Sequence, residues 1–190
     1  MANPYDLIVI GAGAGGLTAA TFGIEFGARV ALVERGKIGG DCTWTGCVPS
    51  KSLLKAAKVA HSARHGETYG IATSDVEIEF AQIMARVHRI VEETYAGESP
   101  EALREQGIDV VLGEARFAGP HTVVVGDQIL KGRTIILATG AHPFVVPIPG
   151  VDEVPYLTSE TVWDLETCPS RLIIIGGGPI GCELAQAFQR

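Results

Sequence analysis

The first 34 residues place apolar runs and glycine turns in the order of a strand, a helix and a second strand. Residues 5–10 form a short apolar run that ends at a glycine, which is typical of a buried parallel strand. Residues 14–26 carry apolar side chains at helical spacing, and Gly27 ends that helix. Residues 29–33 form a second apolar run. The pattern therefore predicts a βαβ unit that closes at Glu34.

Helical patterns dominate the next part of the chain. Residues 37–46 read as a loop, and a helix is expected from about residue 48 to residue 64. Residues 76–95 place apolar side chains on one face of a long helix. Residues 97–100 interrupt this helix, and a short helix is expected to follow through Leu103.

The third part of the chain predicts short strands and then an irregular stretch. Turn residues separate the apolar runs 110–112, 116–117, 122–125 and 128–130, which predicts a small antiparallel meander. Residues 134–137 predict another buried strand. Prolines make residues 141–169 an irregular connector, and residues 171–175 predict a strand followed by glycines and a helix start. This last strand opens a second βαβ unit that is not closed, so we expect the chain to be a fragment of a longer protein.

Composition excludes several classes of protein. The chain has 190 residues, of which 46% are hydrophobic and 19% charged, so it can bury a core. Its formal charge of −7 comes without a basic cluster, which argues against nucleic acid and anionic membranes as partners. The N-terminus lacks the basic stretch of a signal peptide. Four cysteines, two of them close together, fit an intracellular redox protein, so we expect a cytoplasmic location.

A glycine motif lies between the first strand and the first helix. Gly11, Gly13 and Gly16 fit the pattern G-x-G-x-x-G, in which the glycines allow a tight turn, backbone approach to a pyrophosphate and close helix–strand packing. Glu34 ends the next strand, 21 residues after Gly13, where a carboxylate can accept a hydrogen bond from a ribose hydroxyl. On its own Glu34 would be a solvated acid at a strand end. In this context the sequence predicts a dinucleotide-binding site.

Cys42 and Cys47 follow this unit and are the most specific chemical feature. Two thiols this close can store two electrons as a disulfide, and the start of a helix favours the reactive thiolate. The alternatives are two reduced buried cysteines or a structural disulfide, although closing so small a loop adds little stability through loop-closure entropy. A metal site would need more ligands than His61 and His65, which read as surface histidines, so no resident metal is predicted.

The run from Gly39 through Cys42 and Cys47 to Lys51 resembles the redox-active disulfide signature of the flavin-dependent pyridine nucleotide–disulfide oxidoreductases. That family includes dihydrolipoamide dehydrogenase, glutathione reductase and mercuric reductase. The resemblance extends over essentially the whole chain and includes a second glycine fingerprint that ends near Glu183. It implies an α/β fold with an FAD/NAD(P)-binding Rossmann-like domain, a parallel sheet and a small antiparallel meander, here truncated.

The resemblance also implies cofactors and site residues. FAD would bind first, and NAD(P)H would bind in the full-length protein. Cys47 matches the thiol that contacts the flavin, Cys42 the thiol that attacks the substrate, Lys51 a lysine near the flavin, and Glu183 the carboxylate partner of that lysine. The implied cofactor-binding residues are Gly11, Gly13, Ala14, Gly15, Gly16, Glu34, Arg35, Gly40, Asp41, Cys42, Lys51, Ala115, Ala138, Thr139, Gly140, Gly176, Gly178 and Gly181.

Two positions depart from the family pattern. Asp41 stands where the family usually has threonine, and it adds a negative charge beside the cysteines. Trp44 stands where the family usually has asparagine, and it could cover the disulfide or pack within the loop, of which we favour packing. Both changes leave the substrate open between a small-molecule disulfide and a metal ion.

The domain and function expectations follow from the same resemblance. Residues 1–147 are expected to form the first part of an FAD-binding domain, and residues 171–190 the start of an NAD(P)-binding domain. Residues 148–170 are expected to connect the two. The full-length protein is expected to be a homodimeric oxidoreductase, whereas the fragment alone is expected to be inactive. The alternatives are a non-catalytic flavin-binding redox sensor and a purely structural nucleotide-binding domain.

Overall fold

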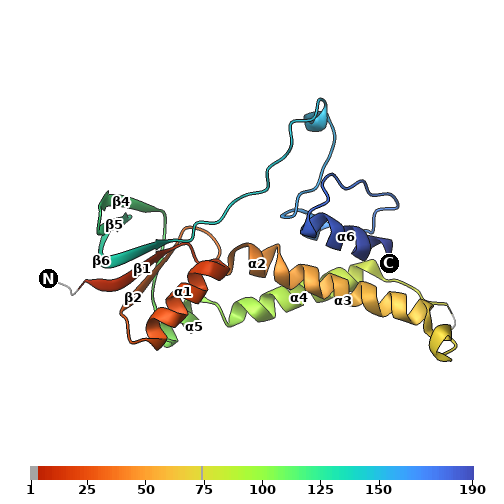
Figure 1. The fold of residues 1–190 in the computed structure, drawn as a ribbon, viewed down its shortest axis with the longest axis horizontal. Coiled ribbons are helices and arrows are strands. Elements are labelled where there is room, and N and C mark those ends of the chain that lie inside the picture. The colour runs from red at the N-terminus through yellow and green to blue at the C-terminus, as the bar shows by residue number, and fades with distance from the viewer. Residues whose placement is uncertain (1–3, 74) are drawn as a thin grey trace. The chain divides into compact units, whose positions relative to one another are not determined.

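The computed structural model describes residues 4–73 and 75–190 (Figure 1). The chain divides into two compact units. Unit 1 comprises Met1–Trp44 and Glu93–His142, and unit 2 comprises Thr45–Glu92 and Pro143–Arg190. Among the described residues, the helices are too short or too polar to cross a bilayer.

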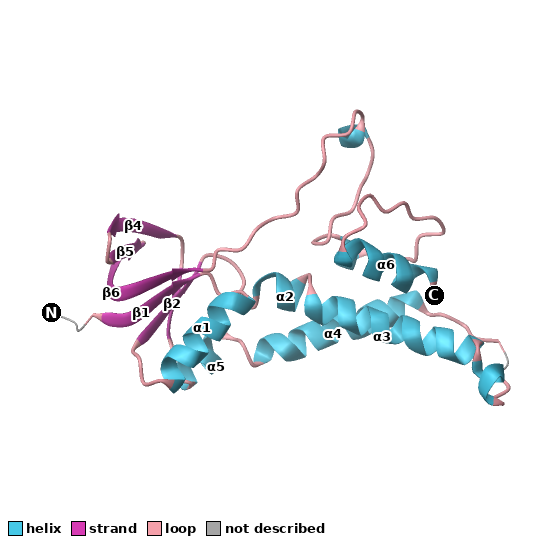
Figure 2. Cartoon of the chain, in the orientation of Figure 1, coloured by secondary structure: helices cyan, strands magenta, loops and turns pink. Residues whose placement is uncertain are grey.

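Unit 1 is built on a sheet with the strand order β3-β2-β1-β6-β5-β4 (Figure 2). Strands β1, β2 and β3 and the second half of β6 run parallel, whereas β4, β5 and the first half of β6 form an antiparallel meander. The strands are β1 (Tyr5–Ile10), β2 (Val30–Glu34), β3 (Asp109–Leu112), β4 (Ala115–Gly119), β5 (Thr122–Val125) and β6 (Gln128–Leu137). This arrangement confirms the predicted α/β fold with a parallel sheet and a small meander.

Two apolar clusters cover the opposite faces of the parallel strands. On one face, Val9 and Leu32 pack with residues of α1 (Ala14–Glu25) and α5 (Pro100–Glu105). On the other face, Ile8 packs with Val123 of the meander. Each of these side chains is fully buried, which stabilises the fold by roughly 1.5–3 kcal/mol per residue. Burial on both faces explains why the strands are continuous apolar runs rather than alternating ones.

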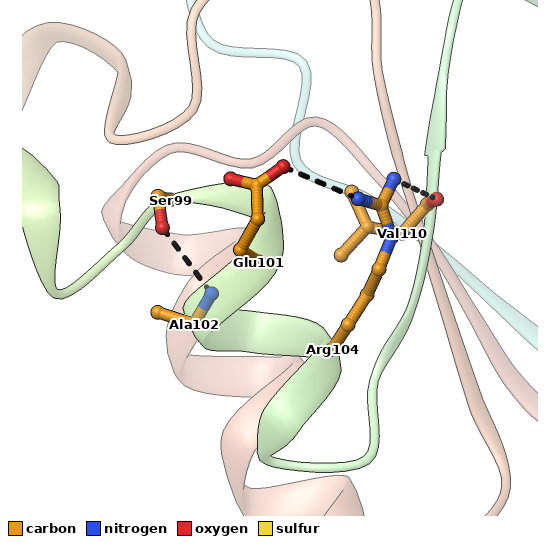
Figure 3. A network of polar contacts seen from close by, with 5 residues as sticks. All are labelled: Ser99, Glu101, Ala102, Arg104 and Val110. Carbon is orange, nitrogen blue, oxygen red and sulfur yellow. Dashed lines mark hydrogen bonds and ion pairs between the residues drawn. The ribbon is translucent and has the colours of Figure 1, made fainter.

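Capping and one ion pair hold α5 beside β3 (Figure 3). The Ser99 hydroxyl accepts a hydrogen bond from the backbone N–H of Ala102 at 3.2 Å, which satisfies one donor of the first turn. Arg104 lies 3.6 Å from Glu101 one turn earlier, and its guanidinium donates to the Val110 carbonyl at 3.2 Å. The Arg104 side chain therefore connects α5 to β3, in addition to the backbone between them.

Unit 2 contains α3 (Cys47–Arg64), most of α4 (Phe80–Ala96) and α6 (Pro179–Gln189). The three helices share an apolar core with the segment around Trp163, a residue that is only 5% exposed. The Trp163 indole N–H donates to the carbonyls of Thr45 and Ser159 at 2.8 and 2.9 Å. The irregular segment before α6 is thereby anchored to the backbone that leads into α3.

Several predicted elements are confirmed and several are wrong. The first strand, the first helix and the helix ending at residue 64 form as predicted, with ends that differ by a residue or two. The predicted loop at 37–46 contains a short helix, α2 (Gly40–Trp44). The long helix begins at Phe80 rather than at residue 76. The short helix ends at Glu105, two residues beyond the predicted Leu103.

Strand pairing accounts for the larger corrections. Residues 110–112 were predicted in the meander but lie in β3, which pairs with β2 in parallel, because α5 returns the chain to that edge of the sheet. Residues 128–130 and 134–137 form one strand, β6. Its polar middle contains Gly132, where an added Cβ would lie 2.7 Å from the Ile8 side chain, so glycine permits close strand contact.

The strand predicted at 171–175 does not form. A strand requires a neighbour to receive its backbone hydrogen bonds. Within the described part of unit 2, no other segment is a strand. Ile173 and Ile175 are accordingly 89% and 70% exposed.

Candidate functional site

The candidate cofactor site of unit 1 lies at the carboxyl edge of the parallel strands. Strands β1, β2 and β6 run parallel, so Gly11, Glu34 and Ala138 follow or end their strands at the same edge. The Ala138 backbone N–H donates to the Ile10 carbonyl at 2.8 Å, which continues the ladder to the last residue of β1. In open α/β sheets, this edge is where ligands bind.

The glycine turn after β1 is shaped by close backbone contacts. Gly11 has φ +101°, a conformation that side chains rarely adopt, and a Cβ there would collide with the Ala138 carbonyl. A Cβ on Gly16 would collide with the Gly11 carbonyl. Beside Gly15, in contrast, the space is open. Helix α1 begins at Ala14 without a side-chain cap, and the N–H groups of a first helical turn have no intrahelical acceptor.

The Glu34 carboxylate is held in place by backbone donors. One oxygen accepts from the Ala12 N–H at 2.6 Å, and the other accepts from the Gly36 N–H at 2.7 Å. The side chain therefore joins the turn after β1 to the loop after β2. Arg35 is exposed next to it, and Ala115 begins β4. That these positions bind the adenosine side of FAD stays a prediction.

The loop after β2 returns to the glycine turn and starts α2 there. The Gly39 N–H donates to the Ala12 carbonyl at 2.8 Å, and Gly39 forms an isolated parallel bridge with Gly13. A Cβ on Gly40 would lie 2.7 Å from the Gly13 Cα, so only glycine permits this approach. Helix α2 therefore starts against the glycine turn that precedes α1. Its next residues are Asp41, which is exposed, and Cys42, which is partly buried.

A partly buried hydrogen bond, which no sequence motif predicts, holds α2 in unit 1. The Thr43 hydroxyl, on a residue 2% exposed, donates to the Glu98 carboxylate at 2.7 Å. Glu98 lies in the interruption between α4 and α5, 55 residues away in the sequence. No motif links two such positions, so only the structure could identify the pair.

Trp44 completes the anchoring of α2. Its ring lies 5.0 Å from the Tyr95 ring, and the Lys37 ammonium lies 4.2 Å over its face. The indole N–H donates to the Ile38 carbonyl at 2.7 Å. The interpretation that Trp44 packs within the loop is confirmed.

Unit 2 carries the other predicted catalytic residues on α3 and α6. Cys47 is the first residue of α3 and is exposed, and the Ser50 hydroxyl donates to its carbonyl at 3.4 Å. Lys51 lies one turn further on, so it shares a helix face with Cys47. Glu183 is exposed on α6, and the structure records no ion pair between Lys51 and Glu183 in the described residues. Their partnership stays a prediction.

The second glycine fingerprint repeats the local geometry of the first. Gly176 has φ +112°, and a Cβ on Gly181 would lie 2.5 Å from the Gly176 carbonyl oxygen. Gly178 is the N-cap of α6, as Gly13 is of α1. The same backbone turn therefore precedes both helices, although the NAD(P)H contacts of the second stay a prediction.

Residues 5–190 match the family model described as pyridine nucleotide-disulphide oxidoreductase. The chain belongs to this family. Its members are flavin-dependent disulfide oxidoreductases that use FAD and NAD(P)H.

Individual relatives of this pyridine nucleotide-disulphide oxidoreductase chain carry different names. A mercuric reductase of Lysinibacillus sphaericus is 39% identical over 97% of this chain and 34% of its own length. A dihydrolipoyl dehydrogenase of Acholeplasma laidlawii is 36% identical over 99% of this chain and 57% of its own length. The chain thus spans about a third to just over half of these two curated relatives.

Solved structures of one flavoprotein share the fold. The Cu(II) complex of the HOCl-induced flavoprotein disulfide reductase RclA from Escherichia coli matches 96% of this chain with a TM-score of 0.77 and 30% identity. A cysteine-to-serine variant of the same complex matches 98% of this chain with a TM-score of 0.80. These matches cover 39% and 40% of the respective RclA chains.

All four cysteines lie in the part of the chain that the structure describes. The boundary between the units follows Trp44, so Cys42 belongs to unit 1 and Cys47 to unit 2. Pairing of these two thiols stays a prediction from the sequence. Cys168 and Cys182 are exposed in unit 2.

Proposed function

We propose that the full-length protein passes electrons from NAD(P)H through FAD to a Cys42–Cys47 disulfide and from the resulting dithiol to a small-molecule disulfide or a metal ion. The observation that carries the proposal is the placement of the two cysteines in a chain of this family. Cys42 lies in α2, which starts against the glycine turn after β1, and Cys47 is the exposed first residue of α3.

For a disulfide substrate, the two thiols have separate tasks. The Cys42 thiolate attacks one substrate sulfur, forms a mixed disulfide and releases the first substrate thiol. The Cys47 thiolate then attacks the Cys42 sulfur, which releases the second thiol and leaves the Cys42–Cys47 disulfide. The two electrons and two protons of the dithiol have then passed to the substrate. Bound FAD supplies the two electrons that regenerate the dithiol.

Other residues bind or orient in this proposal. The Glu34 carboxylate, already held by two backbone N–H groups, accepts from the adenosine ribose. The N-terminus of α1 faces the pyrophosphate. Lys51 provides a positive charge on the Cys47 face of α3, and Glu183 offsets that charge when the lysine is desolvated.

We propose a metal ion as the alternative substrate because the relatives are named for different substrates. The mercuric reductases are named for a metal ion, whereas the dihydrolipoyl dehydrogenase is named for a disulfide-forming cofactor. We further propose that the full-length protein is a homodimer in the cytoplasm, and that the 190-residue chain alone does not turn over.

The test uses the chain itself. The chain is incubated with FAD and desalted, and bound flavin is measured by absorbance. It is then equilibrated in glutathione buffers of graded potential, and peptide mass spectrometry after alkylation reports which cysteines pair. We expect bound FAD and a Cys42–Cys47 disulfide that Cys42→Ser abolishes and Cys168→Ser leaves intact.

Four outcomes would contradict parts of the proposal. A chain that pairs other cysteines in preference would remove the redox centre, and one that binds no FAD would favour a structural domain. Steady-state NAD(P)H consumption by the isolated chain would contradict the expected inactivity. In the full-length protein, disulfide formation without turnover on disulfides or metal ions would favour a redox sensor.

A further inference from the structure

Two histidines that the proposed function does not use lie together at the end of α3. His61 is in the last turn of α3, and His65 is the residue that ends it. Their rings face each other with centroids 4.1 Å apart and an interplanar angle of 34°. Sequence alone favours isolated surface histidines at these positions, but the structure brings the two rings together on one helix face.

We propose that His61 and His65 together bind one divalent transition-metal ion of the kind that imidazole favours, namely Cu²⁺, Ni²⁺ or Zn²⁺. Imidazole nitrogens bind such ions at about 2.0–2.1 Å. The centroids of two rings on one ion therefore lie within roughly 4–5 Å of each other. The observed spacing of the rings already meets this requirement. Histidines four residues apart on a helix are the arrangement that zinc enzymes use for the same purpose.

A backbone hydrogen bond already sets the form of one ring. The Nδ1 atom of His65 lies 2.8 Å from the His61 carbonyl oxygen, which can only accept, so Nδ1 carries the hydrogen. Nε2 is then the ring nitrogen of His65 that is left to bind a metal. Metal-bound histidines characteristically donate their other ring N–H to a carbonyl or carboxylate in this way.

The rings open into a cavity of about 370 Å³ between α3 and α6 of unit 2. Gln186 and Gln189 of α6 line it, so their amide oxygens can complete the coordination of an ion held by two nitrogens. Arg64 and Arg190 also line it and oppose a cation. The Arg64 guanidinium donates a hydrogen bond to the Arg190 carbonyl, so this charged group already has an acceptor.

The groups around His61 disfavour a positive charge on its ring. Partial desolvation lowers the pKa of its ring, and the neighbouring His65, Arg190 and Arg64 lower it further. Because the same two arginines repel a bound cation, we expect a site that depends on both imidazoles.

The pair is separate from the thiols on the same helix. Cys47 precedes His61 by 14 positions, which places them about 21 Å apart along α3 at 1.5 Å per residue. A single ion cannot be shared over that distance. The inference therefore does not depend on the redox function, and either can fail while the other holds.

The experiment titrates the whole 190-residue chain with Ni²⁺ after N-ethylmaleimide has blocked its cysteines. Isothermal calorimetry is expected to show one ion per chain, and His61→Gln or His65→Gln is expected to weaken binding about 10–100-fold. The control is His121→Gln, an exposed histidine of unit 1 before β5, which is expected to change nothing. Circular dichroism confirms that each variant is folded.

Electron paramagnetic resonance with one equivalent of Cu²⁺ gives a second measurement. We expect nitrogen splitting from two imidazoles in the unsubstituted chain and from one in either variant. Equal affinity in the chain and in both variants would overturn the proposal, as would a loss of the same size in His121→Gln. A signal with a single imidazole in the unsubstituted chain would also overturn it.

Discussion

Replacing Trp163 with phenylalanine tests how the entry to α3 is held. The substitution keeps a buried aromatic ring but removes the indole N–H, which donates to the carbonyls of Thr45 and Ser159 at 2.8 and 2.9 Å, and leaves a small cavity where the larger indole packed. One shared donor is lost and two carbonyls lose a partner. We therefore expect the free energy of unfolding to fall by about 1–2 kcal/mol for the hydrogen bond and its partly desolvated acceptors, and further for the cavity that the smaller ring leaves in the core.

The consequence should reach Cys47, which begins α3 two residues after Thr45. Once the Thr45 carbonyl is released, the first turn of α3 should fray more often, and the Cys47 thiol should react faster with iodoacetamide. Urea unfolding measures the stability, and peptide mass spectrometry measures the alkylation rate at Cys47 separately from the exposed Cys168.

A matched control is Tyr69→Phe, which removes a polar group from an aromatic ring that is 84% exposed. We expect this control to change stability by less than about 0.5 kcal/mol. The reasoning is refuted if Trp163→Phe and the control unfold at the same urea concentration. An unchanged alkylation rate at Cys47 with reduced stability would refute only the link from Thr45 to α3.

Three further predictions concern unit 1. Gly16→Ala should abolish FAD uptake, measured by bound flavin after desalting, because its Cβ would collide with the carbonyl of the first glycine in the turn. Thr43→Val should cost about 1–3 kcal/mol in urea unfolding, because the Glu98 carboxylate keeps its partly buried place without its donor; an unchanged midpoint would show that the bond contributes nothing. The backbone N–H of Arg29 lowers the pKa of Asp6 below its ordinary value of 3.8, so this carboxylate contributes stability above that value and loses it as the pH falls through the lowered pKa. Asp6→Asn should therefore flatten the acid side of the stability profile, and a profile that keeps its slope would contradict this assignment.

The anchoring of α2 bears on the departure of this chain from the family pattern. Trp44 is held by Tyr95, Lys37 and the Ile38 carbonyl, so a residue unusual for the family occupies a specific packing position. The neighbouring Thr43 is bound to Glu98. Cys42 therefore sits in a short helix with partners on both of the following residues, which restricts the positions that its sulfur can reach.

Much of unit 1 could be predicted from the sequence because its signals are local. An apolar run, a glycine turn and a helical repeat identify β1, α1 and β2, and each depends on residues that are neighbours in the chain. The glycines of both fingerprints were recognisable for the same reason, since the turn they permit is a property of a few consecutive residues.

The elements around the glycine turns could be predicted from the sequence, and so could the places of Cys42, Cys47 and Glu34 among them. Tertiary structure decided which segments pair, because hydrogen bonds between strands and contacts between distant side chains leave no pattern in either partner alone. It joined two apolar runs into β6, placed β3 beside β2, bonded Thr43 to Glu98 across 55 positions and turned His61 and His65 toward each other. It also left residues 171–175 without strand structure, since a strand exists only beside a neighbour that accepts its hydrogen bonds.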